Sequence, residues 1–479
     1  MTRIPRVTSG TPGLDEVLGG GFISGQTAIV SGGPGSGKTV IALQFLAAAD
    51  RGLYIGFEER EEDIRENAAR LDIDLSTVEI LDLSANGSRF FDTEDEYTIF
   101  PHEEVEGEEL LDSVAAEIDD IDPDRLAIDP LSELRSLVPD DYRFRRNISS
   151  LVNELKTRDI TTVCTTQATD TTNDWDLQFL GDATIEINRT TNHRSLEVTK
   201  FRGSDSASGR HTYRIHGETG GRVYPKLVPG DHSRTTDRAQ LSSGVEELDS
   251  LLGGGIERGS VTVLSGPSGV GKTTLGSLFL RSASKGGMPA AGFLFEELQA
   301  DYLYRADQLG LGIESLHEEG PLRLFEMESL TQSPDEFAAS VREAVDDGVE
   351  LVMIDGIPGY RLGLRGDDTD QELSRELHAL CRYLKRMGVT TILIDEVRGL
   401  AGSLDATDEK VSYLADNIVF LRYVEMDGEI RKVVGVLKKR FSGFEQSPRE
   451  LQIDTDGVTL SETLTNRRGI LSGVPERIR

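Results

Sequence analysis

Two stretches of this chain align with each other without a gap at an offset of 234 residues. Residues 8–39 read TSGTPGLDEVLGGGFISGQTAIVSGGPGSGKT, and residues 242–273 read SSGVEELDSLLGGGIERGSVTVLSGPSGVGKT. A repeat of more than about 200 residues has the size of a domain, unlike the short units that stack in a solenoid. The repeat therefore predicts two tandem domains of one fold.

The join between the two domains is expected in residues 226–241, KLVPGDHSRTTDRAQL. This stretch is polar, contains a proline and a glycine, and has no hydrophobic periodicity, which is typical of a linker. We therefore expect a first domain at 1–230, a second at 231–460 and a C-terminal tail at 461–479.

Apolar stretches of strand length alternate with helical stretches in both halves. QTAIVSG, LYIGFEE, VEILDL, RLAIDPL and ITTVCTTQ predict strands in the first half, and VTVLSG, AAGFLFEE, LRLFEM, ELVMIDG and VTTILIDE repeat the scheme in the second. Ile64, Ala68 and Leu71 share one face of a predicted helix. Continuous apolar strands separated by helices indicate an α/β fold, here two domains that each have a mostly parallel β-sheet flanked by helices.

Each half carries a phosphate-binding motif of the form G-x-x-x-x-G-K-[ST], at residues 32–39 and 266–273. Each motif follows a predicted strand and opens a predicted helix, which is the context that this motif requires. Glycines let backbone N–H groups converge on phosphates at a helix N-terminus, and the lysine reaches the outer phosphates. We expect ATP to contact Gly35, Ser36, Gly37, Lys38, Thr39 and Val40 in the first half, and Gly269, Val270, Gly271, Lys272, Thr273 and Thr274 in the second.

Acidic residues that follow predicted strands are candidates for a Mg²⁺ site. Asp129 and Asp355 each end an apolar strand at a comparable distance after the motif lysine. With the motif threonines, Thr39 and Thr273, they are the predicted metal ligands. The neighbouring strands end at Gln167 in the first half and at Asp395 and Glu396 in the second, where a side chain could sense water or phosphate.

Two adjacent glutamates follow the second predicted strand of each half. Glu58 and Glu59 occupy the same position as Glu296 and Glu297. Ligands of open parallel sheets lie beyond the carboxyl ends of the strands, which puts these acids on the edge that carries the phosphate-binding loop. We expect them to orient or deprotonate the nucleophile that attacks the γ-phosphate.

Basic residues are scarce, and a pair of them recurs near the end of each half. Lys200 and Arg202 are two positions apart, as are Lys438 and Arg440, so strand alternation places each pair on one face. We call these two pairs the terminal pairs. A cationic pair far along the chain from its own loop is suited to reach the γ-phosphate of a neighbouring subunit, like an arginine finger acting in trans.

Together these motifs resemble the KaiC family of circadian-clock ATPases and their archaeal relatives, over essentially the whole chain. Each half has LDxxLGGG, a phosphate-binding loop, FEE, an apolar strand ending in aspartate and a terminal KxR. The resemblance implies two RecA-like domains, ATP hydrolysis in the first, phosphorylation and dephosphorylation in the second, and a hexameric double ring with ATP between subunits. It implies that the four glutamates are catalytic and that the terminal pairs, with the intervening Phe201 and Lys439, lie at the nucleotide.

One departure from the family pattern concerns phosphorylation. The Ser-Thr pair of the family corresponds to Ser412 followed by Tyr413, with Thr407 upstream. We therefore expect Ser412, or else Thr407, as a phosphate acceptor in a serine/threonine autokinase reaction, and no two-site cycle.

Charge and hydropathy narrow the class of protein. The sequence has 84 acidic against 51 basic residues, a net charge of -33 and 11 lysines, which leaves 40 arginines; this favours a halophilic origin. The charge argues against nucleic-acid binding, and no stretch is long and apolar enough to span a membrane, so we expect a cytoplasmic signalling ATPase with unidentified protein partners. The alternatives are a RecA-like motor on nucleic acid and a regulatory scaffold that binds nucleotide without turnover.

Overall fold

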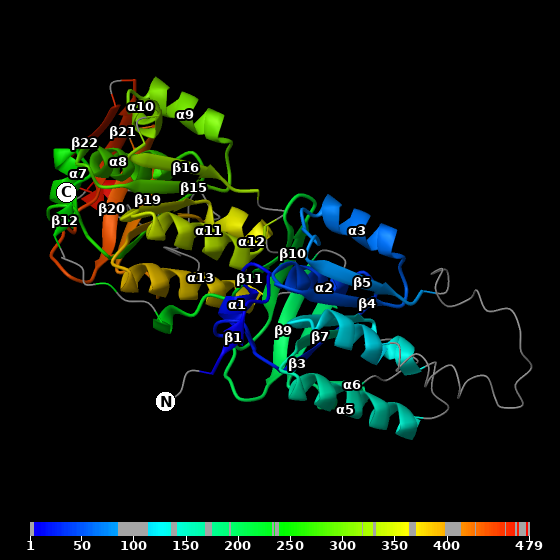
Figure 1. The fold of residues 1–479 in the computed structure, drawn as a ribbon. Coiled ribbons are helices and arrows are strands. Elements are labelled where there is room, and N and C mark those ends of the chain that lie inside the picture. The colour runs from blue at the N-terminus through cyan, green and yellow to red at the C-terminus, as the bar shows by residue number, and fades with distance from the viewer. Residues whose placement is uncertain are drawn as a thin grey trace, which may run out of the picture. The chain divides into compact units, whose positions relative to one another are not determined.

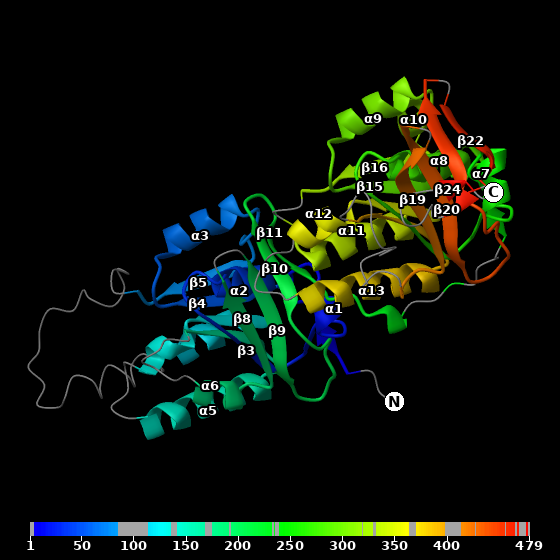
Figure 2. The ribbon, with the colours of Figure 1, turned by 180° about the vertical axis from the view of Figure 1, so that it is seen from behind.

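The computed structural model describes residues 4–84, 114–135, 141–167, 175–190, 193–231, 234, 239–318, 320–328, 332–363, 370–397, 413–426, 428–455, 457–464, 467–468 and 476–477. The chain divides into two compact units, Met1–Lys226 and Leu227–Arg479. Figures 1 and 2 show the elements of both units from opposite sides.

The first unit begins with short elements that lead into a large sheet (Figure 1). Its elements are β1 (Arg6–Val7), α1 (Leu14–Val17), β2 (Phe22–Ile23), β3 (Thr27–Gly32), α2 (Lys38–Ala47), β4 (Gly52–Gly56), α3 (Glu61–Arg70), β5 (Val78–Asp82), β6 (Arg125–Asp129), η1 (Leu131–Arg135), α5 (Asp141–Thr157), β7 (Thr161–Gln167), α6 (Trp175–Leu180), β8 (Ala183–Arg189), β9 (Arg194–Phe201), β10 (His211–His216) and β11 (Gly220–Tyr224).

The second unit repeats this plan (Figure 2). Its elements are η2 (Pro229–Asp231), β12 (Gln240–Leu241), α7 (Glu246–Leu251), β13 (Ile256–Glu257), β14 (Val261–Gly266), α8 (Lys272–Lys285), β15 (Ala290–Leu294), α9 (Gln299–Gln308), α10 (Ile313–Glu318), β16 (Leu322–Glu326), α11 (Pro334–Asp346), β17 (Leu351–Asp355), α12 (Ile357–Gly363), α13 (Asp370–Arg386), β18 (Thr390–Glu396), β19 (Asn417–Met426), β20 (Glu429–Lys439), β21 (Arg449–Asp454), β22 (Gly457–Thr463), β23 (Arg467–Arg468) and β24 (Glu476–Arg477).

Both units are built on a nine-stranded sheet with the same strand order. The order is β5-β4-β6-β7-β3-β8-β9-β10-β11 in the first unit and β16-β15-β17-β18-β14-β19-β20-β21-β22 in the second. Six neighbouring strands of each sheet run parallel, and the last three add an antiparallel extension. The predicted α/β fold is confirmed: the chain contains two tandem RecA-like domains.

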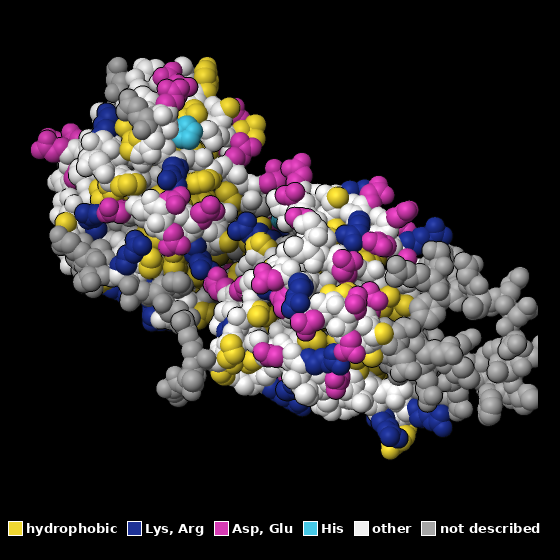
Figure 3. Space-filling view, in the orientation of Figure 1, with side chains coloured by type: hydrophobic (Ala, Val, Ile, Leu, Met, Phe, Trp, Pro, Cys, Tyr) yellow, Lys and Arg dark blue, Asp and Glu magenta, His cyan; other side chains and the backbone are white. Residues whose placement is uncertain are grey.

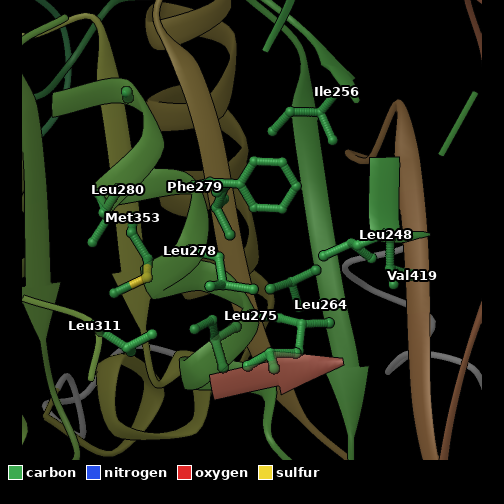
Figure 4. Close-up of a cluster of buried hydrophobic side chains, with 14 of the residues drawn as sticks. Leu248, Ile256, Leu264, Leu275, Leu278, Phe279, Leu280, Leu311, Met353 and Val419 are labelled. Carbon is green, nitrogen blue, oxygen red and sulfur yellow. The ribbon is translucent and has the colours of Figure 1, made fainter. Parts of the chain in front are cut away.

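Strand residues alternate between two cores because successive side chains point to opposite faces of a sheet. On β4, Tyr54 packs with helix α2, whereas Leu53 and Ile55 pack with helix α5 on the other face. The second unit has the same two-sided arrangement, with α8 over one face and α11 and α13 over the other. Figure 4 shows the α8 side, where Leu275, Leu278 and Phe279 meet the strands. The apolar strand runs of the sequence are therefore continuous because both faces are buried.

The stretch that the sequence predicts as a linker packs in part on the second unit. Leu227 is buried in the core that includes α13. The backbone N–H of Arg234 donates to the carbonyl of Arg386 at 2.8 Å, and the Arg386 guanidinium donates to the carbonyl of Gly230 at 2.9 Å. At the other end of this unit, the tail boundary expected after residue 460 falls within β22.

The LGGG loops of the two units are held by cations from different places. In the second unit the Lys439 ammonium donates to the carbonyls of Leu252 and Gly255 and is completely buried. In the first unit Phe201 stands at the position of Lys439, and Arg6 lies over its ring. Arg6 Nη1 donates at 2.8 and 2.7 Å to the carbonyls of Leu18 and Gly21, which are the equivalent loop residues. Both units thus have a cation that donates to the same two loop carbonyls, but the cation comes from a different position in the sequence.

His211 makes the first unit sensitive to acid. Its Nδ1 accepts from the backbone N–H of Lys226 at 2.9 Å, and its Nε2 lies 3.2 Å from the carbonyl of Ala207, so the neutral ring is satisfied on both sides. Burial lowers the pKa of His211. Because the unfolded chain takes up this proton near pH 6.5 and the folded chain does not, stability falls below that pH, by up to about 1.4 kcal/mol per pH unit.

This acid sensitivity can be measured by thermal unfolding between pH 7.5 and 5.5. We expect the midpoint of the wild-type chain to fall more steeply over this range than that of His211→Gln. Equal slopes for the two proteins would contradict the assignment to His211.

Candidate nucleotide sites

The phosphate-binding loops join β3 to α2 and β14 to α8. Gly37 and Gly271 stand directly before the helices with φ of 102° and 115°, in the left-handed region that favours glycine. A Cβ at these positions would clash with Ile215 and Ile453, respectively. Neither helix start has a side-chain cap. Their N-termini are therefore available to an anion.

The two motif lysines are buried inside their loops. Lys38 Nζ donates to the carbonyls of Gly32 and Gly33, both at 3.0 Å. Lys272 Nζ donates to the carbonyl of Pro267 at 2.8 Å and lies 3.9 Å from a carboxylate oxygen of Glu396. Burial lowers the pKa of both lysines. Each ammonium is thus held at the loop that would wrap the phosphates.

The two strand-end aspartates lie beside their loops, in different surroundings. Asp355 Oδ1 accepts from Thr273 Oγ1 at 3.2 Å, so the two predicted metal ligands of the second unit are in contact. Burial raises the pKa of Asp355 to about 7. Asp129 accepts from Tyr54 Oη at 2.8 Å and from Thr165 Oγ1. In the second unit the positions of Tyr54 and Thr165 are occupied by Gly292 and Ile394, which have no hydroxyl.

The two glutamates of each pair lie in different surroundings, which the sequence does not distinguish. Glu58 accepts from Gln167 Nε2 at the end of β7, whereas Glu59 turns to Asn67 on α3, at 3.1 Å. In the second unit Glu297 pairs with Arg305 on α9. The first glutamate of each pair thus faces the strand ends, and the second faces a helix.

The first glutamate of each pair has electrostatic surroundings that suit a base. Partial burial raises the pKa of Glu58, with a further contribution from Asp129. Burial and the nearby Glu396 carboxylate raise the pKa of Glu296. Glu296 also packs against Gly356, where a Cβ would lie 2.6 Å from Glu296 Cγ. A carboxylate whose pKa moves toward neutrality is a better proton acceptor.

The predicted sensor positions differ between the units. Gln167 and Glu396 end equivalent strands and pair with the last residues of β3 and β14, Gly32 and Gly266. Gln167 is a neutral donor to Glu58, whereas Glu396 adds a negative charge close to Lys272. The second site therefore has a carboxylate where the first has a neutral amide.

The terminal pairs lie at the edge of each sheet opposite the phosphate-binding loop. In the second unit Lys439 pairs with Asn417, which pairs with Thr262 near the start of β14. The loop begins after Gly266, which is four residues further along β14 and about 13 Å away at about 3.3 Å per residue. The first unit has the same register: Phe201 pairs with Ala183, which pairs with Ala28 near the start of β3. Neither arginine is therefore close to the loop of its own domain.

Within each terminal pair the lysine is anchored and the arginine is half-exposed. Lys200 Nζ donates to the carbonyls of Gln178, Phe179 and Gly181, and Lys438 Nζ donates to that of Ala415 at 2.7 Å. The side chains of Arg202 and Arg440 are 58% and 52% exposed. The arginines thus keep exposed donors for a second molecule.

The other predicted site residues occupy several environments. Lys439 is buried in its own unit, so its side chain holds the LGGG loop, and Phe201 lies under Arg6. Val270 belongs to the hydrophobic core, which leaves its main chain for a nucleotide. Ser412 and Thr407 lie outside the described residues. The sequence did not predict Tyr54 and Thr165, whose hydroxyls donate to Asp129 from the strands on either side of it. It also did not predict Asp182 and Asp416, which directly precede the equivalent strands β8 and β19.

The residues present fit a nucleotide with Mg²⁺. Mg²⁺ is bound through one or two carboxylates together with substrate phosphates and water, and the contact between Thr273 and Asp355 supplies a hydroxyl and a carboxylate of this kind. Among the described residues, the buried Ser36 Oγ of the first loop has no protein hydrogen-bond partner. In the same part of the chain no group of three or more His, Cys, Asp or Glu side chains is arranged for a metal ion, and no helix is long and apolar enough to cross a membrane.

The fold and these loops define a protein with two P-loop nucleotide-binding domains of the RecA type. The model of the family described as "ATPase: KaiC" matches residues 7–228 and 241–465. The chain therefore belongs to the KaiC family of ATPases.

Curated relatives match over nearly the whole chain. The circadian clock oscillator protein KaiC of Picosynechococcus sp. is 27% identical over 490 residues, which cover 97% of this chain and 91% of that protein. The circadian clock protein KaiC3 of Synechocystis sp. is 25% identical over 489 residues, covering 98% and 95%. The KaiC of Thermostichus vulcanus is 26% identical over 500 residues, covering 99% and 93%.

Proposed function

We propose that the chain hydrolyses ATP with Mg²⁺ at both P-loop sites, and that a neighbouring copy of the chain completes each site. The observation that carries this proposal is the position of Arg202 and Arg440 at the sheet edge opposite their own loops. A ring in which the loop edge of one copy faces the arginine edge of the next brings the two together. The sequence resemblance favours six copies.

The residues of this chain divide the work at each site. Lys38 and Lys272, with the helix N-termini, bind the phosphates. Glu58 and Glu296 orient the attacking water and take its proton. Bound Mg²⁺, held by Thr39 and Asp129 or by Thr273 and Asp355, would neutralise charge on the β- and γ-phosphates. The arginine of the next copy stabilises the charge that develops on the γ-phosphoryl group.

We also propose a phosphotransfer reaction to a hydroxyl at the second site, which the family resemblance implies. When Ser412 replaces water, its Oγ forms a bond to the γ-phosphorus, the bond from that phosphorus to the bridging oxygen of ADP breaks, and Glu296 takes the hydroxyl proton. The adjacent Tyr413 is exposed, with its ring 5.4 Å from that of His378. We propose a regulatory role in which the nucleotide and phosphate state of the ring controls a protein partner.

The net charge of -33 supports this assignment over a nucleic-acid motor. On the face that Figure 3 shows, acidic and basic side chains of the described residues are interspersed over each unit.

Turnover measurements with radiolabelled ATP test the proposal. We expect Lys38→Ala and Lys272→Ala each to abolish the phosphate release that one site contributes. The double variant should release no phosphate. Label retained on a peptide that contains Ser412, and lost in Ser412→Ala, supports phosphotransfer. Full phosphate release by the double variant would contradict hydrolysis at these sites, whereas release without any retained label would remove the phosphotransfer step alone.

A further inference from the structure

A buried aspartate stands next to the terminal pair in both units. Asp182 and Asp416 directly precede β8 and β19, and their residues are 5% and 0% exposed. The backbone N–H groups of these aspartates donate to the carbonyls of Thr27 and Val261 at 2.7 and 2.8 Å. The aspartates are therefore tied to the first strand of each P-loop domain by main-chain bonds.

The Asp416 carboxylate has three donors around it. Lys385 Nζ, from the last turn of α13, lies 2.7 Å from both oxygens. Arg440 Nη1 donates to Oδ1 at 3.2 Å, and the backbone N–H of Val261 donates to Oδ2 at 3.1 Å. A carboxylate with this many fixed partners has little freedom to rotate.

The first unit repeats this cluster with longer distances. Lys156 Nζ lies 3.3 Å from both oxygens of Asp182, and the backbone N–H of Thr27 donates to Oδ2 at 3.4 Å. Arg202 Nη1 lies 3.8 Å from Oδ1. Both clusters consist of one aspartate, one lysine and one arginine in the same arrangement, in repeats that differ at many other positions.

The lysine and the arginine of each cluster have different environments. Lys385 and Lys156 already provide a counter-charge for the buried carboxylate, so the arginine is not its only cationic partner. The arginines touch the aspartate with one edge, and about half of the side chain remains in solvent. Asp416 therefore orients the Arg440 guanidinium through a hydrogen bond, and Asp182 attracts that of Arg202 at a longer distance, while each guanidinium still has exposed donors. Preorganisation of this kind makes a charged group effective at a developing charge.

We propose that Asp182 and Asp416 are positioning residues that hold Arg202 and Arg440 in the orientation in which they meet the phosphates of the neighbouring copy. This inference rests on the proposed function, because it assumes that the arginines act in trans. It assigns the aspartates no contact with nucleotide.

The test uses the full-length chain in a Lys38→Ala background, so that turnover reports the second site. We expect Asp416→Asn to lower kcat about 10- to 100-fold, since a displacement of about 1 Å can cost that much, with KM changed less than about threefold. Lys385→Met is the matched control, because it removes the other cation of the cluster. We expect this control to lower the unfolding midpoint, because a buried carboxylate loses one partner, and to keep kcat within about twofold, because Arg440 stays paired with Asp416.

A double variant separates positioning from a general loss of structure. If Asp416 acts through Arg440, adding Asp416→Asn to Arg440→Ala leaves kcat unchanged from the single arginine variant. Multiplicative effects would overturn the inference, as would an unchanged kcat in Asp416→Asn when Arg440→Ala is impaired. An unchanged kcat in Arg440→Ala would instead contradict the proposed trans role itself. Should Asp416→Asn fail to fold, Asp182→Asn and Arg202→Ala in a Lys272→Ala background give the same comparison.

Discussion

Replacing Glu58 and Glu296 with glutamine is expected to lower ATP turnover about 10² to 10⁴-fold, the usual contribution of a general base. Glutamine keeps the size and hydrogen-bonding capacity of the side chain and loses only the ability to accept a proton. Binding of ATP should therefore stay within a few-fold of the wild-type value. Initial-rate phosphate release and equilibrium binding of a labelled nucleotide measure the two effects separately.

The second glutamate of each pair provides the matched control. Glu59 and Glu297 carry the same charge one residue further on, but they face Asn67 and Arg305 on the adjoining helices. We expect Glu59→Gln and Glu297→Gln to change turnover far less than the changes at Glu58 and Glu296. The reverse order would show that the wrong member of each pair has been assigned as the base.

Removing the guanidinium groups is expected to have an effect of similar or larger size. Loss of an arginine that acts in trans lowers turnover about 10³ to 10⁵-fold in other phosphoryl-transfer enzymes. We expect losses in this range for Arg202→Ala and Arg440→Ala, each measured with the other site silenced. Arg210, which directly precedes β10, and Arg431, which lies on β20, are suitable controls. They pair with glutamates, Arg210 with Glu197 and Arg431 with Glu429 and Glu450. Their replacement by alanine should leave turnover nearly unchanged.

The sequence predicts the parallel part of each sheet well, for a physical reason. A strand buried on both faces must be apolar throughout, so every one of the ten predicted strand stretches corresponds to a strand of the structure. Motif context is equally informative, because a loop that must approach phosphate requires glycines at fixed positions. The direction of side chains beyond a strand end is not encoded in this way, so the sequence treats Glu58 and Glu59 as equivalent.

Contacts between residues far apart in the chain were the least predictable part. Asp416 is one of 84 acidic residues, and nothing in its neighbourhood marks it until β19 and β20 pair and bring Arg440 beside it. The contact that Lys439 makes was equally hard to predict from the sequence. It follows Lys438 in a basic run, yet its ammonium lies inside the second unit on the LGGG loop, where the first unit uses Arg6.

The claim that neighbouring copies share each site can be tested by mixing two inactive proteins. One carries Arg202→Ala and Arg440→Ala and keeps its phosphate-binding loops; the other carries Lys38→Ala and Lys272→Ala and keeps its arginines. If the arginines act in trans, random mixed rings formed from equal amounts regain about a quarter of wild-type turnover, because half of the intact loops face an intact arginine. If the mixture, shown to contain both proteins in one assembly, stays as inactive as its components, the arginines serve their own copy and the account is contradicted.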